Sequence, residues 1–393
     1  MNGVVIAGAG QAGHQLALSL RDKGYARSIT LIESEDTLPY QRPPLSKDYL
    51  FPAGDPVDVW LASTEEYAEL GIDFRPGQRV ESIDRGSREV LLGSGDVLRY
   101  EQLVLATGVR ARPLDVPGLP LTGVHTLRTV QDAQQLRRQL DDAVEVVVIG
   151  AGFIGLEFAT GAIRQGRRVT VLEAAPRILA RSLSAATAAF LHQRHTEDGV
   201  TIETNVAVAR LHGRDGRVSE VQLADGRVLP ADLVVVGIGV LPNDELAVHS
   251  GLYVDGSGIV VDEFLRTSDP FIHAIGDVVS FPNGFALRQT RVESVQNAVD
   301  QGRCLAATLT GTPRAYQDLP WFWSHQAGHL VQIAGIGQGH DTTDVRASPD
   351  PRSFSAYCYR EDQLVAVESI DQPRIHMSAR RQLAAARGRA PIG

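Results

Sequence analysis

Two glycine-rich segments of this chain have the residue types and spacing of a phosphate-binding loop. The first, Gly8-Ala9-Gly10-Gln11-Ala12-Gly13, follows the apolar run Val4-Val5-Ile6. The second, Gly150-Ala151-Gly152-Phe153-Ile154-Gly155, follows Val146-Val147-Val148-Ile149. In such a fingerprint the glycines allow a tight turn and let the backbone approach a pyrophosphate at a helix N-terminus. The spacing therefore predicts two sites, each of which binds a dinucleotide.

An acidic residue stands at the expected distance after each fingerprint, about 20 residues further on. Glu33 follows the run Ile29-Thr30-Leu31-Ile32, and Glu173 follows Val169-Thr170-Val171-Leu172. Such a carboxylate accepts a hydrogen bond from a ribose 2′-hydroxyl and repels the 2′-phosphate of NADPH, so Glu173 predicts a preference for NADH. Arg177 could soften that repulsion, or be an ordinary surface arginine. Two glycine-rich turns that bind nothing would not explain the acids.

Alternating strand and helix patterns must position these loops. We expect a strand at 102–106, a helix over 130–140 and a strand at 233–236, in addition to the strands that flank the fingerprints. This alternation predicts an α/β fold with parallel, doubly wound sheets. Beyond about Pro313 the pattern changes to short strands, such as 330–333 and 354–359, which predict a smaller α+β domain.

The composition is that of a globular protein, with 43% hydrophobic and 22% charged residues. The 38 basic and 47 acidic side chains give a net charge of −9, which argues against nucleic acid as the main partner. No apolar run reaches about 18 residues, so we expect no membrane span. The N-terminus lacks a cationic lead and reads as a core strand rather than a signal peptide, which favours a cytoplasmic location.

The two cysteines limit how electrons could leave this protein. Cys304 and Cys358 are far apart, and no CxxC or CxxxxC dithiol is present. Two dinucleotides imply one electron donor and one acceptor, commonly a nicotinamide and a flavin. Without a dithiol the electrons must leave the flavin directly, and a flavin can release them one at a time to an iron-sulfur carrier.

Six short segments outside the fingerprints carry a resemblance to known reductases. Ala106-Thr107-Gly108, Gly237-Ile238-Gly239 and Ala274-Ile275-Gly276-Asp277 are similar to signatures of flavoproteins that bind two dinucleotides. Three others resemble, in this order, the NADH-dependent ferredoxin reductases of oxygenase systems. They are Arg42-Pro43-Pro44-Leu45-Ser46-Lys47, Arg291-Val292-Glu293-Ser294-Val295-Gln296-Asn297-Ala298 and Pro320-Trp321-Phe322-Trp323-Ser324.

The resemblance covers essentially the whole chain and implies a glutathione-reductase-like fold. Two Rossmann-type dinucleotide-binding domains would be joined by a small α+β C-terminal domain. Residues 1–110 and 242–315 would bind FAD, residues 111–241 would bind NADH, and residues 316–393 would form the C-terminal domain. The implied activity is NADH:ferredoxin reduction: FAD accepts a hydride from NADH and passes single electrons to a [2Fe-2S] ferredoxin, which serves a cytochrome P450 or a ring-hydroxylating dioxygenase.

The resemblance also assigns cofactor contacts by position. Asp277 would bind the ribityl chain, or would otherwise cap a helix, and Val80 would contact FAD through its backbone, or would otherwise be a core residue. The implied FAD contacts are Gly8, Gly10, Ala12, Gly13, Glu33, Arg42, Lys47, Val80, Thr107, Gly108, Arg128, Gly276, Asp277, Val295 and Trp323. The implied NADH contacts are Gly150, Gly152, Ile154, Gly155, Glu157, Glu173 and Gly239.

Lys47 and Glu157 are the residues that the resemblance places nearest the reacting atoms. It implies that the two side chains meet close to the flavin edge where the hydride arrives. A buried lysine without its carboxylate would be an uncompensated charge, so the two would be kept together. Otherwise Lys47 is a solvated loop residue and Glu157 an ordinary helix residue.

The exit of electrons needs a local basic surface, because ferredoxins are usually acidic and this chain is acidic overall. The resemblance places Trp323 at the exposed flavin edge, or else it packs within the C-terminal domain. Arg303, about two helical turns after Val295, is our first candidate for docking. The tail from Gln372, with Arg374, Arg380, Arg381, Arg387 and Arg389 and no acid, is expected to be a solvated basic helix and is the second candidate.

Three other functions stay open at this point. A rubredoxin reductase or an NADH oxidase would use the same two cofactors and differ only in the electron acceptor. A flavoprotein similar to apoptosis-inducing factor would act mainly in binding or signalling. Turnover with candidate carriers distinguishes these functions.

Overall fold

The computed structural model describes residues 3–52, 54–55 and 57–387, which divide into two compact units. The first unit contains the described residues up to Gln41, together with Val59–Arg110 and Pro242–Phe322. The second contains Arg42–Asp58, Ala111–Leu241 and the described residues from Trp323 onward. Each unit is therefore assembled from three separate stretches of the chain. Residues 42–58 group with the predicted NADH-binding and C-terminal segments; the predicted division into FAD, NADH and C-terminal domains stays a prediction.

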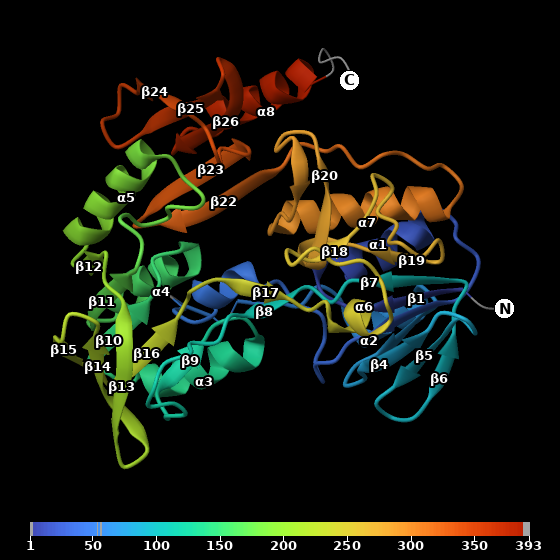
Figure 1. The fold of residues 1–393 in the computed structure, drawn as a ribbon, viewed down its shortest axis with the longest axis horizontal. Helices are drawn as coiled ribbons and strands as arrows, with labels where there is room; N and C mark the ends of the chain where they lie inside the picture. The colour runs from blue at the N-terminus through green and yellow to red at the C-terminus, as the bar shows by residue number, and fades with distance from the viewer. Residues whose placement is uncertain (1–2, 53, 56, 388–393) are drawn as a thin grey trace. The chain divides into compact units, whose positions relative to one another are not determined.

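A parallel five-stranded sheet in the order β19-β7-β1-β2-β3 forms the centre of the first unit. The central strand β1 is wholly apolar and buried, and the apolar residues of its neighbours join it in one core, as in other parallel sheets whose faces are covered. Helices α1 and α7 pack side by side (Figure 1). The bounds are β1 Val4–Ala7, β2 Ile29–Ile32, β3 Ile72–Arg75, β7 Gln102–Leu105, β19 Ile272–Ala274, α1 Gln11–Asp22 and α7 Val295–Leu309.

Short elements complete the first unit around this sheet. An antiparallel meander is formed by β4, β5 and β6, and a smaller sheet has the order β18-β20-β21. The bounds are β4 Val80–Asp84, β5 Glu89–Leu92, β6 Val97–Arg99, β18 Ile259–Val260, β20 Val279–Asn283, β21 Arg288–Thr290, α2 Thr64–Glu69, α6 Glu245–His249 and the 3₁₀ turn η2 Gly276–Val278. Two short strands, β8 Val109–Ala111 and β17 Val240–Pro242, span the points where the chain leaves and re-enters this unit.

The second unit repeats the same plan with a parallel sheet in the order β12-β11-β10-β16-β9. The expected helix over 130–140 is α3 and the expected strand at 233–236 is β16. The bounds are β9 Val124–Thr126, β10 Glu145–Ile149, β11 Arg168–Glu173, β12 Thr201–Thr204, β16 Leu233–Val236, α3 Val130–Leu140, α4 Phe153–Arg164, α5 Ala185–Glu197, the 3₁₀ turn η1 Pro43–Ser46, and the meander β13 Val208–Arg214, β14 Arg217–Leu223 and β15 Val228–Pro230. The predicted α/β fold with two parallel sheets is confirmed.

The C-terminal segment forms a five-stranded sheet in the order β22-β23-β26-β25-β24, covered by helix α8 (Figure 1). The strands expected at 330–333 and 354–359 lie within β23 and β25, so the predicted small α+β domain is confirmed. Helix α8 (Pro373–Arg387) buries His376, Ala379 and Leu383 against the sheet and exposes Arg374 and Arg381, so it is basic on its outer face; Arg389 lies outside the described residues. The strand bounds are β22 Trp321–Gln326, β23 His329–Gly335, β24 Thr342–Ala347, β25 Phe354–Arg360 and β26 Gln363–Ile370.

Candidate functional site

The first fingerprint links β1 to α1, and its three glycines have two kinds of role. Gly8 has a φ of 108°, and a Cβ there would lie 2.3 Å from the carbonyl oxygen of Ala106. A Cβ on Gly13 would lie 2.0 Å from the carbonyl oxygen of Gly8. A Cβ on Gly10, by contrast, would meet nothing within 4 Å. Gly8 and Gly13 are therefore required by the fold, whereas Gly10 leaves open the space that a pyrophosphate would fill.

The second fingerprint links β10 to α4 with the same division of roles. Gly150 has a φ of 104°, and its Cβ would lie 2.5 Å from the carbonyl oxygen of Gly237. The Cβ of Gly155 would lie 2.4 Å from the carbonyl oxygen of Gly150. At Gly152 the nearest atom to an added Cβ is 3.9 Å away, so this middle glycine again borders open space. Both loops fit a dinucleotide by the same geometric test.

The N-termini of α1 and α4 lie at the two glycine loops and present the positive end of the helix dipole to an anion. Neither helix has a side-chain cap or an acidic residue in its first turn. Helices α2, α3, α5 and α7, by contrast, each begin after a Ser or Thr whose side-chain oxygen accepts a hydrogen bond from the first turn. A helix N-terminus without a side-chain cap or an acidic residue is a favourable place for a phosphate group.

Glu33 and Glu173 lie at the ends of β2 and β11, where each carboxylate is fixed by backbone hydrogen bonds. The Oε2 of Glu33 accepts from the N–H of Ala9 at 2.9 Å, and the Oε2 of Glu173 accepts from the N–H of Ala151 at 2.7 Å. In both cases Oε1 accepts from the N–H two residues further along the chain. Oε1 of Glu33 also accepts from the hydroxyl of Ser34 at 3.2 Å, whereas Oε2 of each residue accepts the one bond described and has a lone pair that could accept from a ribose hydroxyl.

Two further predicted FAD contacts of the first unit, Thr107 and Gly108, lie in a loop that is hydrogen-bonded to the loop at Asn243. Thr107 Oγ1 donates to the carbonyl oxygen of Asn243 at 2.7 Å, and Asn243 Nδ2 donates to that of Thr107 at 2.8 Å. These two bonds hold the turn at Gly108, where φ is 64°. Val80 is buried at the start of β4, and Val295 is half-buried at the start of α7. Their contacts with FAD stay predictions.

The turn at Gly276 and Asp277 is supported by a buried polar group that the sequence patterns did not reveal. The N–H of Gly276 donates to Gln301 Oε1 at 2.7 Å, and Gln301 is fully buried in α7. Asn297, one helical turn before Gln301, accepts from the hydroxyl of Tyr316 at 3.0 Å. Asp277 is half-buried in η2, and its bond to the ribityl chain stays a prediction. The spacing of Asn297 and Gln301 on one helix face was the available signal.

The predicted contacts within the second unit occupy several elements. Arg42 donates from Nη1 to the carbonyl oxygen of Arg128 at 2.8 Å, so these two predicted FAD contacts lie together. Ile154, in the first turn of α4, is 38% exposed although it is apolar. Gly239 has a φ of 102° and lies beside a guanidinium group. Trp323 is half-buried on β22. A single exposed apolar side chain is common on protein surfaces, so the contact of Ile154 with NADH stays a prediction.

Lys47 and Glu157 form an ion pair in the second unit. Lys47 Nζ lies 2.7 Å from Glu157 Oε2 and also donates to the carbonyl oxygen of Pro43 at 3.1 Å. Glu157 is 7% exposed, and it accepts from the hydroxyls of Ser46 and Ser324, both at 2.5 Å. The carboxylate therefore accepts from three donors, which fix the position of both of its oxygens. The two side chains therefore meet as predicted, and the part of the pair in hydride transfer stays a prediction.

Aromatic packing fastens the Lys47 segment to α4. A Cβ on Gly161 would lie 2.2 Å from a ring atom of Phe51, so the ring occupies the space that a side chain would take. The same ring lies 5.6 Å, centroid to centroid, from Phe158. A glycine inside an apolar helix was the signal, because it weakens the helix unless another group packs there. The contact keeps Lys47 in reach of Glu157.

The two thiols do not offer a route for electrons. Cys304 and Cys358 are buried and free, and burial raises the pKa of Cys304 and raises that of Cys358 to about 12. Both therefore stay protonated and unreactive at neutral pH. Among the described residues no group of His, Cys, Asp and Glu could hold a metal ion, and no helix is long and apolar enough to cross a membrane.

Two parallel sheets, each with an open glycine loop and an acid at the next strand end, define an oxidoreductase that binds two dinucleotides. The family model for pyridine nucleotide-disulphide oxidoreductases matches residues 2–302, and the model for the C-terminal domain of reductases matches residues 321–391. The chain belongs to this family and, within it, to the ferredoxin reductases that use FAD and NAD(H), as the resemblance in the sequence predicts.

Named relatives agree with this assignment. The chain is 47% identical to rhodocoxin reductase of Rhodococcus erythropolis, over 97% of this chain and 89% of the relative. It is 39% identical to rubredoxin-NAD(+) reductase of Pseudomonas putida, over 94% of this chain and 96% of that relative. The crystal structure of the ferredoxin reductase for the CYP199A2 system from Rhodopseudomonas palustris superposes with a TM-score of 0.93 at 46% identity, covering 96% of this chain and 93% of that one.

The open space at Gly10 leads to a test of the first fingerprint. We expect Gly10→Ala to fold with an unchanged thermal midpoint in the FAD-free form, because the added methyl group meets no protein atom. FAD should bind about tenfold or more weakly, because the methyl group enters the pyrophosphate space. Flavin fluorescence titration of the apoprotein measures the affinity. The control is Gly54→Ala, where an added Cβ also meets nothing within 4 Å. Wild-type FAD affinity in Gly10→Ala would place the ligand elsewhere.

The ion pair leads to a second prediction. Removing either Lys47 or Glu157 leaves the other charge without its partner, so Lys47→Ala and Glu157→Gln should each slow the reduction of bound FAD by NADH. The double variant should lose less than the sum of the two single effects. Anaerobic stopped-flow absorbance at a saturating NADH concentration measures the rate. Additive effects in the double-mutant cycle, or an unchanged rate in Lys47→Ala, would show that the pair has only a structural part.

Proposed function

We propose that this protein is an NADH:ferredoxin oxidoreductase that supplies electrons to an oxygenase. The observation that carries the proposal is the pair of open glycine loops in a chain whose only two thiols are buried. One loop holds the electron donor and the other the flavin, and no dithiol relays electrons onward. The acceptor is a [2Fe-2S] ferredoxin, and the oxygenase is a cytochrome P450 or a ring-hydroxylating dioxygenase. The ferredoxin reductase of the CYP199A2 system, 46% identical, supports this assignment.

The chain's residues bind and orient the two cofactors. The α1 and α4 N-termini hold the pyrophosphates of FAD and NADH beside Gly10 and Gly152, and Glu33 and Glu173 accept from the ribose hydroxyls. When bound, the flavin supplies the redox chemistry, since it accepts a hydride and can release two electrons singly. The protein contributes position and charge rather than an acid or a base.

The Lys47–Glu157 pair supplies a fixed charge arrangement one helical turn into α4. Glu157 follows the last glycine of the NADH fingerprint by two residues, so it lies on the helix that begins at the pyrophosphate site. Its three donors keep the carboxylate in one orientation. We assign the pair to alignment of the nicotinamide rather than to proton transfer.

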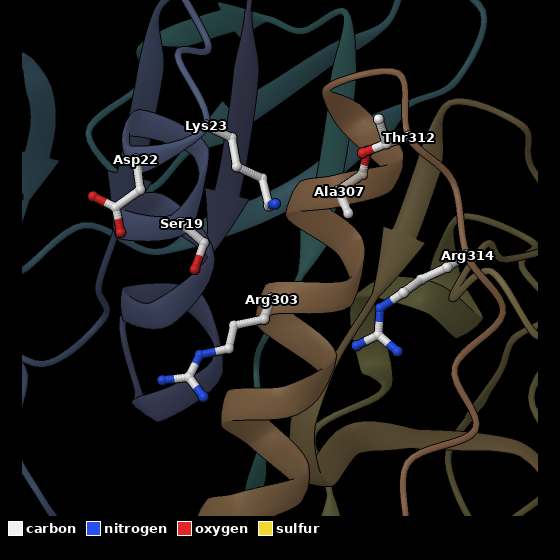
Figure 2. Close-up of a pocket in the computed structure, with 7 residues that line it drawn as sticks. All are labelled: Ser19, Asp22, Lys23, Arg303, Ala307, Thr312 and Arg314. Atoms are coloured by element: carbon white, nitrogen blue, oxygen red, sulfur yellow. The ribbon is translucent and has the colours of Figure 1, made fainter.

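The basic surface near Arg303 is the docking site that we assign to the ferredoxin. Arg303 has a side chain that is 58% exposed and lies 4.0 Å from Asp300. It borders an open pocket of about 570 Å³ that also contains Lys23 and Arg314, as Figure 2 shows. The cations come from the residue that follows α1, from α7 and from the segment after α7. Asp22 also lines the pocket and Arg314 pairs with Asp318 at 3.0 Å, so these acids offset part of the positive charge. An acidic ferredoxin would be attracted to this surface although the whole chain carries a charge of −9.

Rubredoxin reduction is the second candidate function, because a relative at 39% identity bears that name. Both activities use the same two cofactors, so only the carrier distinguishes them. We further propose a cytoplasmic location, since the two free thiols suit a reducing compartment.

Glu173 provides a test of nucleotide choice. Glu173→Ala should lose part of a charge-assisted hydrogen bond worth about 1.5 to 3 kcal/mol, which corresponds to a loss of roughly 10 to 100-fold in kcat/KM for NADH. Use of NADPH should rise, because the repulsion of its 2′-phosphate is removed. Steady-state kinetics with both nucleotides and a small acceptor measure the two effects. Equal turnover of NADPH and NADH by the wild type would contradict the assignment.

Electron delivery tests both the function and the docking site. Wild type should reduce a [2Fe-2S] ferredoxin faster than a rubredoxin. Arg303→Glu should raise the KM for ferredoxin about three- to tenfold at low salt and weaken its salt dependence, leaving turnover with NADH and ferricyanide unchanged. Stopped-flow reduction at two ionic strengths is the measurement.

The matched control for Arg303 is Arg79→Glu. Arg79 is 71% exposed and lies 4.0 Å from Glu81, so the charge change and the weak ion pair are the same. Equal effects of the two substitutions would reduce the docking proposal to a general charge effect. A faster rate with rubredoxin than with every ferredoxin tested would favour the second function.

A further inference from the structure

A buried chain of hydrogen bonds in the second unit ends at Glu157. His195 Nε2 lies 3.0 Å from Gln326 Oε1, Gln326 Nε2 donates to Ser324 Oγ at 2.8 Å, and Ser324 Oγ donates to Glu157 Oε1 at 2.5 Å. The four residues belong to α5, β22 and α4, and none is more than 7% exposed. Three segments far apart in the sequence therefore meet in one polar line.

The donors and acceptors fix the direction of this chain. Gln326 Nε2 has two hydrogens; one goes to the carbonyl oxygen of Phe153 at 3.1 Å and the other to Ser324 Oγ. Its Oε1 must then accept from His195, so the ring hydrogen is on Nε2. Because Ser324 Oγ accepts from Gln326, its single hydrogen is left for Glu157. Every bond thus donates toward the carboxylate, an arrangement in which neighbouring bonds strengthen one another.

The histidine at the start of the chain is neutral at physiological pH. Burial lowers the pKa of His195 to about 4. The charged and titratable groups that act on it are Asp198 and His192 near its own helix and His329 on β23. In the neutral ring with hydrogen on Nε2, Nδ1 is an acceptor and lies 3.3 Å from Thr160 Oγ1, whose hydroxyl also lies 3.0 Å from the carbonyl oxygen of Leu156. The histidine therefore supplies a donor to Gln326 without adding a charge.

We propose that Gln326 is a positioning residue, which with His195 turns the hydroxyl of Ser324 toward Glu157 and so holds the carboxylate in line with Lys47. The proposal rests on the proposed function, since it concerns the carboxylate of the NADH-binding helix. Lys47 and Ser46 both bind Oε2 of Glu157, whereas Ser324 binds Oε1. Without Gln326 the Ser324 hydroxyl could rotate, and Oε1 would be a buried acceptor with a loosened partner.

Four substitutions distinguish the effect of hydrogen-bond direction from the effect of side-chain packing. Ser324→Ala removes the donor to Glu157, and Ser324→Thr keeps it. Gln326→Glu keeps the shape but replaces the NH₂ donor with an acceptor, which draws the Ser324 hydrogen away from Glu157. Gln326→Leu removes both functions. The matched control is Gln222→Leu, which removes an equivalent pair between His212 Nε2 and Gln222 Oε1, 3.0 Å apart, on the β13–β14 hairpin.

Two spectroscopic readings on the FAD-loaded protein, without NADH or ferredoxin, report the chain itself. Labelling with ¹⁵N-histidine should show the His195 ring, assigned by its loss in His195→Gln, with hydrogen on Nε2 at pH 7. Labelling with ¹³C-glutamate should show the Glu157 carboxyl resonance, assigned by its loss in Glu157→Gln. We expect that resonance to move in Ser324→Ala, Gln326→Glu and Gln326→Leu, and to stay in Ser324→Thr and Gln222→Leu.

Flavin reduction by NADH gives the functional reading. The three disrupting variants should slow the limiting rate about tenfold with little change in the apparent Kd for NADH, whereas Ser324→Thr should stay within about twofold of wild type. If Gln326→Leu does not fold, Ser324→Ala and Gln326→Glu decide. Hydrogen on Nδ1 of His195, or an unmoved Glu157 resonance in Gln326→Glu, would overturn the proposal. If the enzyme reduced no ferredoxin, the proposed function would be contradicted. The two resonances would not be affected by that result, because they are recorded without ferredoxin.

Discussion

The close approach of the polypeptide backbone to itself at the fingerprint glycines is the constraint on which both cofactor sites depend. Gly13 lies against the carbonyl of Gly8, and Gly155 against that of Gly150, at distances that leave no room for a side chain. This contact lets each helix begin directly after the glycine loop that follows its strand, where the helix N-terminus favours a phosphate group. A similarly close contact occurs where Gly302 of α7 packs against the backbone of α1. The sites thus follow from steric fit before any charge is considered.

Charge enters with Glu157, a nearly buried carboxylate whose desolvation must be offset by its partners. Ser46 and Lys47 come from the segment between the first two stretches of the other unit, and Ser324 comes from the C-terminal sheet. A buried ion pair contributes little to stability when compared with apolar packing, and its loss on one side is costly. The arrangement is therefore best understood as a way to fix orientation, which a reaction between two bound rings requires.

Local patterns in the sequence were sufficient for the fingerprints, the acids and most strands, because each of these depends on residues that are neighbours in the chain. The strand expected to reach Ala106 ends at Leu105, a difference within the usual uncertainty of strand ends. The approach of Lys47 to Glu157 came from family resemblance and not from spacing. The partners Ser46, Gln326 and His195 did not emerge, since their bonds join segments more than 100 residues apart and no periodic pattern encodes them. Phe51 on Gly161 was missed for the same reason.

The way in which the second unit is assembled has a bearing on how such reductases could be recombined. Its three stretches, Arg42–Asp58, Ala111–Leu241 and the chain from Trp323 onward, all contribute to the hydrogen bonds of Glu157, and the first two are also joined by the packing of Phe51 on Gly161. A chimaera that exchanged only the contiguous NADH-binding segment between relatives would separate Glu157 from the donors that surround it in this chain. The natural module for grafting nucleotide specificity is therefore discontinuous, and crossover points chosen by domain names alone would divide it.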